Sequence, residues 1–284
     1  MPLSPSDQNR LHNTAIADGR NGRIEGLPAD KVVFSTYQDK AIWGEDVTAL
    51  FSQFGNQHPG GTYIDIGANI GLTLIPQAKS GLFRHLIAIE ADPLNAELLT
   101  RNIAHNDCPP VTIINQAISD KTGTISFERA PDNFGDHRLH KDTPSASNDL
   151  MAEATRDLIT APTAPLDELL GDIDSLPRPL CIKSDIQGAE PLLFRGGKHV
   201  LAQASLMLIE YWPYGMTRLG EDIAAFQQEL ASHFSQGAFI WPHEPTAPPQ
   251  WQPLPPLFAE ADRIFESGDT MLHKVGCLNI ALRP

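Results

Sequence analysis

Residues 64–71 read IDIGANIG and combine residue types that suit a ligand-binding turn. An apolar run ends in Asp65, and the small residues after it lead into a segment with helical periodicity. Glycines in such a turn let the backbone approach a ligand closely, while free N–H groups at the helix start point outward. Asn can stand in for a glycine there because it tolerates left-handed conformations. We therefore predict a binding loop that contains Asp65, Gly67, Asn69 and Gly71.

Glu90 indicates which kind of ligand this loop holds. It ends the next apolar run, 19 residues after Gly71, an offset at which a carboxylate accepts hydrogen bonds from both ribose hydroxyls. The loop reads GxNxG, whereas a dinucleotide fingerprint reads GxGxxG. Two carboxylates, Asp65 and Glu90, repel the phosphates of a dinucleotide but suit the net-positive S-adenosylmethionine. The sequence therefore favours a sulfonium cofactor over NAD.

Three further side chains are candidates to accept a proton from a hydroxyl. Asp185 and Glu210 each end a predicted strand, at the sheet edge where open α/β sheets bind ligands. His137 lies in an irregular segment and carries an imidazole, which titrates near neutral pH. Each has a structural alternative: a helix cap for Asp185, a turn-bound carboxylate for Glu210, and a solvated loop position for His137. Lys183, next to this group, is expected to pair with an acid.

Short apolar runs alternate with amphipathic segments over most of the chain. Strands are predicted at 62–66, 86–90, 111–118, 180–185 and 206–211. Helices are predicted at 71–79, 93–106 and 191–203, and a last strand at 276–282. Such alternation is typical of right-handed βαβ crossovers. It predicts an α/β fold with a doubly wound, mostly parallel Rossmann-like sheet and an antiparallel strand near the C-terminus.

The N-terminal part has a less regular pattern. Residues 1–30 show no sustained apolar period and are expected to form a loosely held arm. The apolar spacing over 37–54 predicts an amphipathic helix. We therefore assign 1–58 to an arm with a helical cap and 59–284 to a single Rossmann-like domain.

Two irregular insertions are expected in that domain. The first, at about 120–150, is polar and carries one short predicted strand, at 124–128. The second, at about 241–258, is too rich in proline for a helix or central strand over 241–256, which predicts an extended surface loop. Within it, Trp241 and Trp251 either stack on a sugar face or anchor the loop.

The composition is that of a folded globular protein. The 284 residues are 41% hydrophobic and 20% charged, with a formal net charge of −14. So acidic a surface repels a phosphate backbone, and nucleic acid is not an expected partner. The sequence has no apolar run of the roughly 20 residues that span a membrane and no signal-like start, which predicts a cytoplasmic protein. Three cysteines without CxxC spacing do not indicate a disulfide framework.

An ordered series of motifs resembles the FkbM family of class I S-adenosylmethionine-dependent methyltransferases. IDIGANIG and IEADP (89–93) are similar to the first two motifs of the class. IKSDIQGAE (182–190), followed by a helix and a glycine, is similar to the family's IKIDVEGAE, and AISD (117–120) also fits the pattern. The resemblance covers about residues 60–212. Ser184 and Gln187 depart from it, because the family usually has an apolar residue and an acid at these positions.

The resemblance implies a methyltransferase that uses S-adenosylmethionine. It implies transfer to a hydroxyl oxygen, often that of a sugar or a polyketide, so a small-molecule or carbohydrate acceptor is expected. It also implies that Ala91 borders the cofactor beside Glu90, and that Ser119 and Asp120 hold the adenine amine. Which acceptor the chain uses, and its oligomeric state, are not indicated by the sequence.

Other interpretations remain open at this point. An NAD-dependent oxidoreductase is compatible with the same sheet, although its glycine spacing differs. A binding module that keeps the nucleoside site but has lost its chemistry is also compatible, because Gln187 replaces an acid. A divalent metal is possible, since Asp185 and Glu210 have oxygen ligands for Mg²⁺ or Ca²⁺, but no ligand set requires one.

Overall fold

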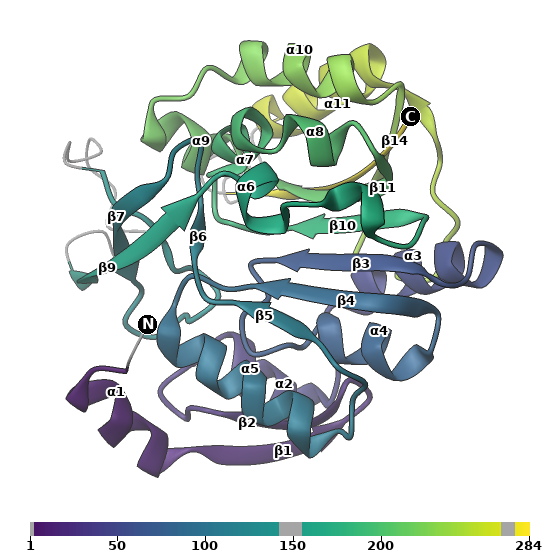
Figure 1. The fold of residues 1–284 in the computed structure, drawn as a ribbon. Coiled ribbons are helices and arrows are strands. Elements are labelled where there is room, and N and C mark those ends of the chain that lie inside the picture. Colours follow the sequence, from purple (N-terminus) through teal and green to yellow (C-terminus); the bar gives the residue numbers. More distant parts are fainter. Residues whose placement is uncertain (1–2, 142–154, 268–275) are drawn as a thin grey trace.

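The computed structural model describes residues 3–141, 155–267 and 276–284 (Figure 1). Within these residues, eight strands form one sheet in the order β13-β12-β14-β11-β10-β3-β4-β5. Its parallel part contains β3 (Gly61–Ile66), β4 (Phe83–Ile89), β5 (Thr112–Ile114), β10 (Leu180–Ser184) and β11 (Ala204–Tyr211). β14 (Leu278–Arg283) pairs antiparallel with both β11 and β12 (Gln236–Ile240), and the short β13 (Gln252–Pro253) pairs with β12. This order confirms the predicted doubly wound sheet with an antiparallel strand near the C-terminus.

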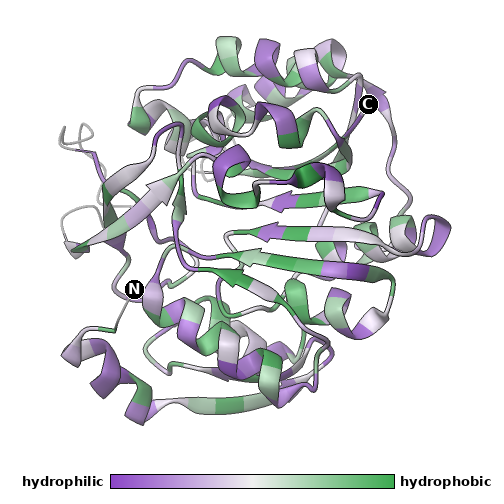
Figure 2. Cartoon of the chain, in the orientation of Figure 1, coloured by the Kyte–Doolittle hydropathy of each residue, from purple (hydrophilic) through white to green (hydrophobic). Residues whose placement is uncertain are grey.

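The direction of winding reverses at β3. The chain passes from β3 to β4 and β5 on one side, and later to β10 and β11 on the other. The connections after β3 and β10 therefore diverge and leave a crevice at the carboxyl ends of these strands. In Figure 2, β10 changes from hydrophobic green to hydrophilic purple toward its arrowhead. β3 has an acid, Asp65, directly before its last residue, Ile66. Polar side chains are thus placed at the edge of the sheet where a ligand has room.

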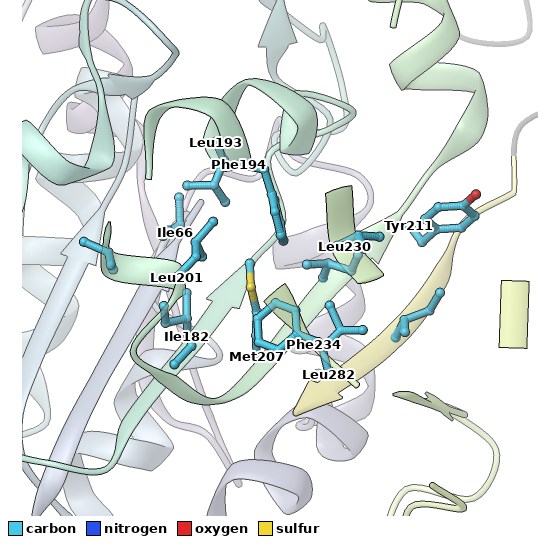
Figure 3. Close-up of a cluster of buried hydrophobic side chains, with 14 of the residues drawn as sticks. Ile66, Ile182, Leu193, Phe194, Leu201, Met207, Tyr211, Leu230, Phe234 and Leu282 are labelled. Carbon is cyan, nitrogen blue, oxygen red and sulfur yellow. The ribbon is translucent and has the colours of Figure 1, made fainter. Parts of the chain in front are cut away.

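Apolar side chains form a core on each face of the sheet. On one face, Ile182 and Ile209 pack with the cluster of Figure 3, which includes residues of α7 (Glu190–Gly196), α8 (Lys198–Leu201), α10 (Ile223–His233) and α11 (Leu254–Glu266). On the other, Tyr63 and Cys181 pack with residues of α3 (Glu45–Gln57), α4 (Leu74–Ser80) and α5 (Pro93–His105). Burial on both faces explains why β3 and β10 are apolar almost throughout.

The first insertion forms a second, smaller sheet. Its strands are β6 (Ala117–Ile118), β7 (Gly123–Arg129), β8 (Arg138–Leu139) and β9 (Asp157–Ala164), in the order β6-β9-β7-β8. The strand expected at 111–118 is therefore divided between two sheets, and the strand expected at 124–128 belongs to this one. β9 carries a proline and few large apolar residues, so its sequence did not predict a strand. Residues 142–150 of the predicted insertion, and the four residues that follow them, lie outside the described residues.

The N-terminal residues are packed onto the sheet domain, so the prediction of a loosely held arm is wrong. They form α1 (Pro5–Arg10), a 3₁₀ turn (Leu11–Asn13) and a hairpin of β1 (Ala15–Gly19) and β2 (Gly22–Gly26). Ile24 is fully buried, and Asn102 on α5 bonds the backbone of Glu25 through both its oxygen and its nitrogen. The pattern was missed because only a few apolar residues of this segment face the core.

Three other predicted elements have different bounds. The helix expected at 37–54 is two helices, α2 (Val33–Lys40) and α3, because Ala41 and Gly44 are left-handed, with φ of 54° and 56°. The helix expected at 191–203 is divided into α7 and α8. The proline-rich loop ends earlier than expected, since α11 begins at Leu254 with its prolines in the first turn, where a missing N–H costs nothing. The described residues also contain three short elements: α6 (Leu166–Leu170), a 3₁₀ turn (Ile173–Ser175) and α9 (Pro213–Leu219).

Candidate active site

A cavity lies where β3, β4 and β10 end. The loop after β3 forms one wall. The loop after β10, the start of the second sheet and the N-terminal segment form the others. The polar lining residues include Asn69, Glu90, His137, Lys183 and Asp185. The apolar ones include Ile66, Ile89, Ile118, Phe127, Phe134 and Leu139. A pocket of apolar walls with a few directed polar groups is the usual form of a small-molecule site.

The glycine loop has the backbone that its sequence predicts. Gly67 has φ of 75°, and a Cβ there would collide with the carbonyl oxygen of Asp185. Asn69 is left-handed, with φ of 49°, and its side-chain nitrogen donates to the carbonyl of Phe134 at 2.9 Å. Gly71 has φ of 94° but does not line the cavity, because its Cα faces Leu99 on α5. Gly67 and Asn69 therefore border the ligand space, while Gly71 shapes the turn behind it.

Glu90 enters the cavity from the end of β4 in a fixed orientation. Its Oε2 accepts the N–H of Asn69 at 2.8 Å, and its Oε1 accepts the N–H of Asp92 at 2.8 Å. Burial raises the pKa of this carboxyl to about 7, against the opposing effect of these backbone hydrogen bonds. Each oxygen has a second lone pair that can accept a hydroxyl proton. Glu90 and its neighbour Ala91 both line the cavity, as their predicted roles require.

Asp65 lies beneath the glycine loop and does not reach the cavity. It is fully buried, accepts a hydrogen bond from the Thr73 hydroxyl at 2.7 Å, and pairs with Lys183 at 3.1 Å. Burial raises the pKa of Asp65, although Lys183 opposes this. The ammonium of Lys183 also donates to the carbonyl of Gly67 at 2.9 Å. The expected pairing of Lys183 with an acid is confirmed, and Asp65 acts on the ligand space only through the loop it supports.

Gln187 joins the two carboxylates that the sequence proposed for proton transfer. Its side-chain nitrogen donates to Asp185 at 2.7 Å and to Glu210 at 2.9 Å. Asp185 lines the cavity with a side chain 39% exposed, whereas Glu210 lies behind Gln187 and is not a lining residue. Burial, together with the charges of Asp185 and Glu190, raises the pKa of Glu210 well above its ordinary value. Of the two carboxylates, Asp185 and Glu210, it is Asp185 that can touch a ligand in the cavity.

Glu190 orders the loop that carries Asp185. Its two carboxylate oxygens accept the N–H groups of Ile186 and Gly188, each at 3.0 Å. Burial raises its pKa to about 7. Glu190 belongs to the motif at 182–190, but no role was expected for it. Its position at the first residue of α7, directly after a glycine-containing loop, is the signal that points to a carboxylate that caps backbone N–H groups.

His137 lines the cavity but is poorly suited to act as a base. Its Nδ1 accepts the N–H of Ala130 at 3.1 Å, so in the neutral ring Nε2 carries the proton. Burial lowers the pKa of His137 to about 4. Neither ring nitrogen has a free lone pair near neutral pH, and the side chain is instead packed against Phe134, with ring centres 5.3 Å apart.

Ser119 and Asp120 do not line the cavity. The Ser119 hydroxyl donates to Asp120, and Asp120 pairs with Arg195 at 3.5 Å. The chain turns away into the second sheet at this point, so the wall is built instead by the three residues before Ser119, at 116–118. The adenine contacts that the resemblance implies for Ser119 and Asp120 stay a prediction, and the structure places both residues outside the lining of this cavity.

The N-terminal segment closes the cavity, which the sequence did not indicate. Val33 and Trp43 are lining residues. Asp30, buried, accepts the N–H groups of Val33 at 3.0 Å and Phe134 at 3.3 Å, and so fastens the segment to the first insertion. The signal available in the sequence was Asp30 itself, two residues before the apolar run at 32–34, where a capping acid is common.

A buried ion-pair network also fastens the N-terminal segment that closes the cavity. Arg129, at the end of β7, pairs with Asp7 on α1 at 2.7 Å and with Asp92 at the start of α5. Asp92 also caps α5, and its Oδ1 accepts the N–H of Leu94 at 2.7 Å. Since Asp92 lies two residues after Glu90, this network joins α1 to the ribose side of the predicted site.

The described residues have neither a metal-binding cluster nor a membrane-spanning helix. Within 3–141, 155–267 and 276–284, no group of three or more His, Cys, Asp or Glu side chains is arranged to hold a metal ion. Across the same ranges, no helix is both long enough and apolar enough to cross a membrane.

Comparison with known proteins identifies the family. The model of the methyltransferase FkbM domain matches residues 65–234, more than half of the chain. The chain belongs to the FkbM methyltransferase family. The resemblance proposed from the motifs is thereby confirmed, and the enzyme class is that of an S-adenosylmethionine-dependent methyltransferase.

Individual relatives of this FkbM protein are distant. The hexuronic acid methyltransferase AglP of Haloferax volcanii is 28% identical over 149 residues, which is 51% of this chain and 54% of that protein. The ribosomal protein L11 methyltransferase of Myxococcus xanthus is 31% identical over 71 residues, 25% of this chain and 24% of the relative. The chain therefore spans about half the length of the first relative and a quarter of the second.

Similar solved structures share little sequence with it. A SAM-dependent methyltransferase from Agrobacterium tumefaciens has 7% identity and a TM-score of 0.44, covering 100% of this chain and 72% of that one. The M. jannaschii TYW2 structure in complex with AdoMet has 11% identity and a TM-score of 0.38, covering 95% of this chain and 85% of that one.

Proposed function

We propose that this protein transfers a methyl group to a hydroxyl oxygen of a carbohydrate, with S-adenosylmethionine in the cavity at the ends of β3 and β4. The observation that carries the proposal is the placement of Asp185. It is the one acid, among the described residues that line the cavity, with a partly exposed side chain at the carboxyl end of a central strand. It therefore faces the space between the cofactor region and solvent.

The lining residues suit a positively charged nucleoside. Glu90 offers hydroxyl acceptors for the ribose, and Ile118, Phe127 and Phe134 offer an apolar slot for a base. Lys183 is the single lysine or arginine among the described lining residues, and its charge is neutralised by Asp65. Phosphate groups would meet acids here without a free cation, which argues against the NAD-dependent alternative.

The proposed chemistry divides between the cofactor and the protein. S-adenosylmethionine supplies an electrophilic methyl group for an in-line displacement. The protein's part is to align the acceptor, exclude water and take up the hydroxyl proton as the new bond forms. Asp185 is the proposed proton acceptor. Gln187 holds the orientation of its carboxylate, and the ammonium of Lys183 lies 3.7 Å from it.

The carbohydrate acceptor is supported by a relative and by the residue types. The Haloferax relative is a hexuronic acid methyltransferase, and a hexuronic acid is a sugar acid. Enzymes that methylate amines of nucleic acid bases have an Asn/Asp-Pro-Pro-aromatic turn at the corresponding place. In this chain, residues 184–187 read SDIQ, and Asp185 offers carboxylate oxygens that can accept a hydroxyl proton. A hydroxyl is therefore the nucleophile that these side chains suit best.

The test is methyl transfer from labelled S-adenosylmethionine to a panel of free and polymeric sugars. We expect Asp185→Asn to lower the rate by about 10²- to 10⁴-fold while binding S-adenosylhomocysteine as the wild type does. His137→Asn is the control, because His137 lines the same cavity but is poorly suited to accept the proton. This variant is expected to keep most of the activity. Cofactor binding without transfer to any panel member would favour the non-catalytic binding module instead.

A further inference from the structure

A second pocket lies under the proline-rich loop, apart from the cofactor cavity. Its volume is about 450 Å³, and it is enclosed by α3, the end of β12, the loop at 244–252 and α11. The loop is held in place, since Gln53 on α3 donates to the carbonyl of Thr246 at 3.1 Å. This volume falls within the range of small-molecule sites, about 300–1,000 Å³.

Two tryptophans and several hydrogen-bond acceptors line this pocket. Trp251 has the guanidinium of Arg283 over one ring face at 4.3 Å, and Trp241 is braced by Phe239, with ring centres 5.5 Å apart. Asp46, buried, and Glu244 are among the lining acids. Among the described residues that line the pocket, none is a lysine or arginine. Indole rings and carboxylates together suit the C–H face and the hydroxyl donors of an uncharged sugar, and they repel a sugar acid.

A row of polar side chains links this pocket to the reaction centre. Gln187 bonds both Asp185 and Glu210. Glu210 on β11 is directly opposite Asn279 on β14, so both side chains lie on the same face of the sheet. Asn279 then donates to Asp46 at 3.3 Å, and Asp46 lines the second pocket.

The spacing of the strands sets the length of this row. Asp185 directly follows β10, and Trp241 directly follows β12. These two strands are separated in the sheet by β11 and β14. At about 4.8 Å per strand, the two sites are roughly 14 Å apart. This exceeds the size of one sugar ring.

We propose that the Trp241–Trp251 pocket is a second subsite for the methyl acceptor, and that the acceptor is an uncharged oligosaccharide that occupies both sites at once. The inference rests on the proposed methyltransferase function and extends it. One residue of the glycan presents its hydroxyl to Asp185, and a residue further along the chain packs against the indoles. An isolated monosaccharide or a hexuronic acid polymer would lack part of this binding energy.

The test is a glycan array that carries neutral and uronic acid oligosaccharides of graded length, probed with the protein saturated with S-adenosylhomocysteine. Wild-type protein is expected to bind neutral members and to prefer those longer than a disaccharide. Trp241→Ala and Trp251→Ala are expected to weaken this binding about tenfold or more, which corresponds to about 1.4 kcal/mol. Ile16→Ala, an exposed apolar position on β1, is the matched control. Glu244→Lys is expected to improve binding of uronic acid members.

The outcomes separate this inference from the function it rests on. Preference for uronic acid glycans, no neutral glycan bound, or equal binding by the tryptophan variants and the control would overturn the second subsite. Because Trp251 also packs on Arg283, circular dichroism and S-adenosylhomocysteine affinity are measured for every variant. If S-adenosylhomocysteine itself does not bind the folded wild type, the methyltransferase proposal fails, independently of the array.

Discussion

At the scale of residues, the site is built by buried carboxylates that order backbone N–H groups. Glu90 and Glu190 each accept two N–H groups and so fix the loops after β4 and β10. Both carboxyl groups are buried, and burial raises the pKa of each to about 7. Their protonation state near neutral pH therefore affects ligand binding and stability.

Glu90 provides a pH-dependent prediction for cofactor binding. Its ionised form accepts ribose hydroxyls, so affinity for S-adenosylhomocysteine should fall as the pH is lowered through about 7. At about pH 8, Glu90→Gln should bind about 1–3 kcal/mol more weakly, and its affinity should vary less with pH. Calorimetric titration over this range measures both effects. Glu97→Gln, on the outer side of α5, is the control, and an identical loss in both variants would contradict the assignment.

At the scale of elements, the sequence predicted those parts whose local pattern coincides with their packing. The strands at 62–66, 180–185 and 206–211 are buried on both faces, so their apolar runs identified them. The glycine loop was predicted well because positive φ requires the small or amide side chains that stand there, Gly67 and Asn69. The placement of loop carboxylates was less predictable. Asp65 and Glu210 were expected at the ligand, but Lys183 on β10 and Gln187 in the loop after it hold them behind the cavity lining.

The cover of the site was not predictable in the same way. Its contacts join residues more than a hundred positions apart, as between Asp7 and Arg129, and one sequence has no local pattern for such pairs. The second sheet was partly missed for a related reason. β9 is stabilised by its pairing with β7 along Asp157–Thr163 rather than by an apolar period of its own.

The helix α1 provides an element-scale prediction. Asp7→Ala should lower the free energy of unfolding by about 1–3 kcal/mol, because it leaves buried N–H groups of Arg129 without their acceptor while Asp92 still balances the charge. Arg10→Ala on the same helix removes only an exposed pair with Asp157, 3.5 Å apart, and should cost at most about 1 kcal/mol. Chemical denaturation of both variants measures the difference. Equal small losses would show that α1 is not fixed by the buried network.

At the scale of the whole molecule, the cavity connects parts of the chain that belong to different elements of the fold. The central sheet supplies Gly67, Glu90 and Asp185, the second sheet supplies Phe127, and the N-terminal segment supplies Trp43. The division at residue 58 into a cap and a domain stays a prediction, but both parts line the same cavity. Folding and cofactor binding should therefore be coupled across the whole chain.

Stability should also depend on pH through the buried carboxyls. The folded-state pKa of Glu190, about 7, lies above its ordinary value of 4.5, so between these values the folded protein binds a proton that the unfolded chain releases. Its contribution to stability is therefore greatest below about pH 4.5 and is lost as the pH rises to about 7. In Glu190→Gln, the fall in unfolding free energy between about pH 5 and pH 7 should be smaller than in the wild type. Urea denaturation at several pH values measures this slope, and an unchanged slope would contradict the assignment.

The most direct test of the account is a calorimetric titration of the folded, ligand-free protein with S-adenosylhomocysteine, beside an identical titration with NAD. We predict one-to-one binding of S-adenosylhomocysteine in the micromolar range and no heat from NAD. Binding of NAD instead, or of neither compound, would contradict the central claim that the cavity between Glu90 and Asp185 holds the methyl donor.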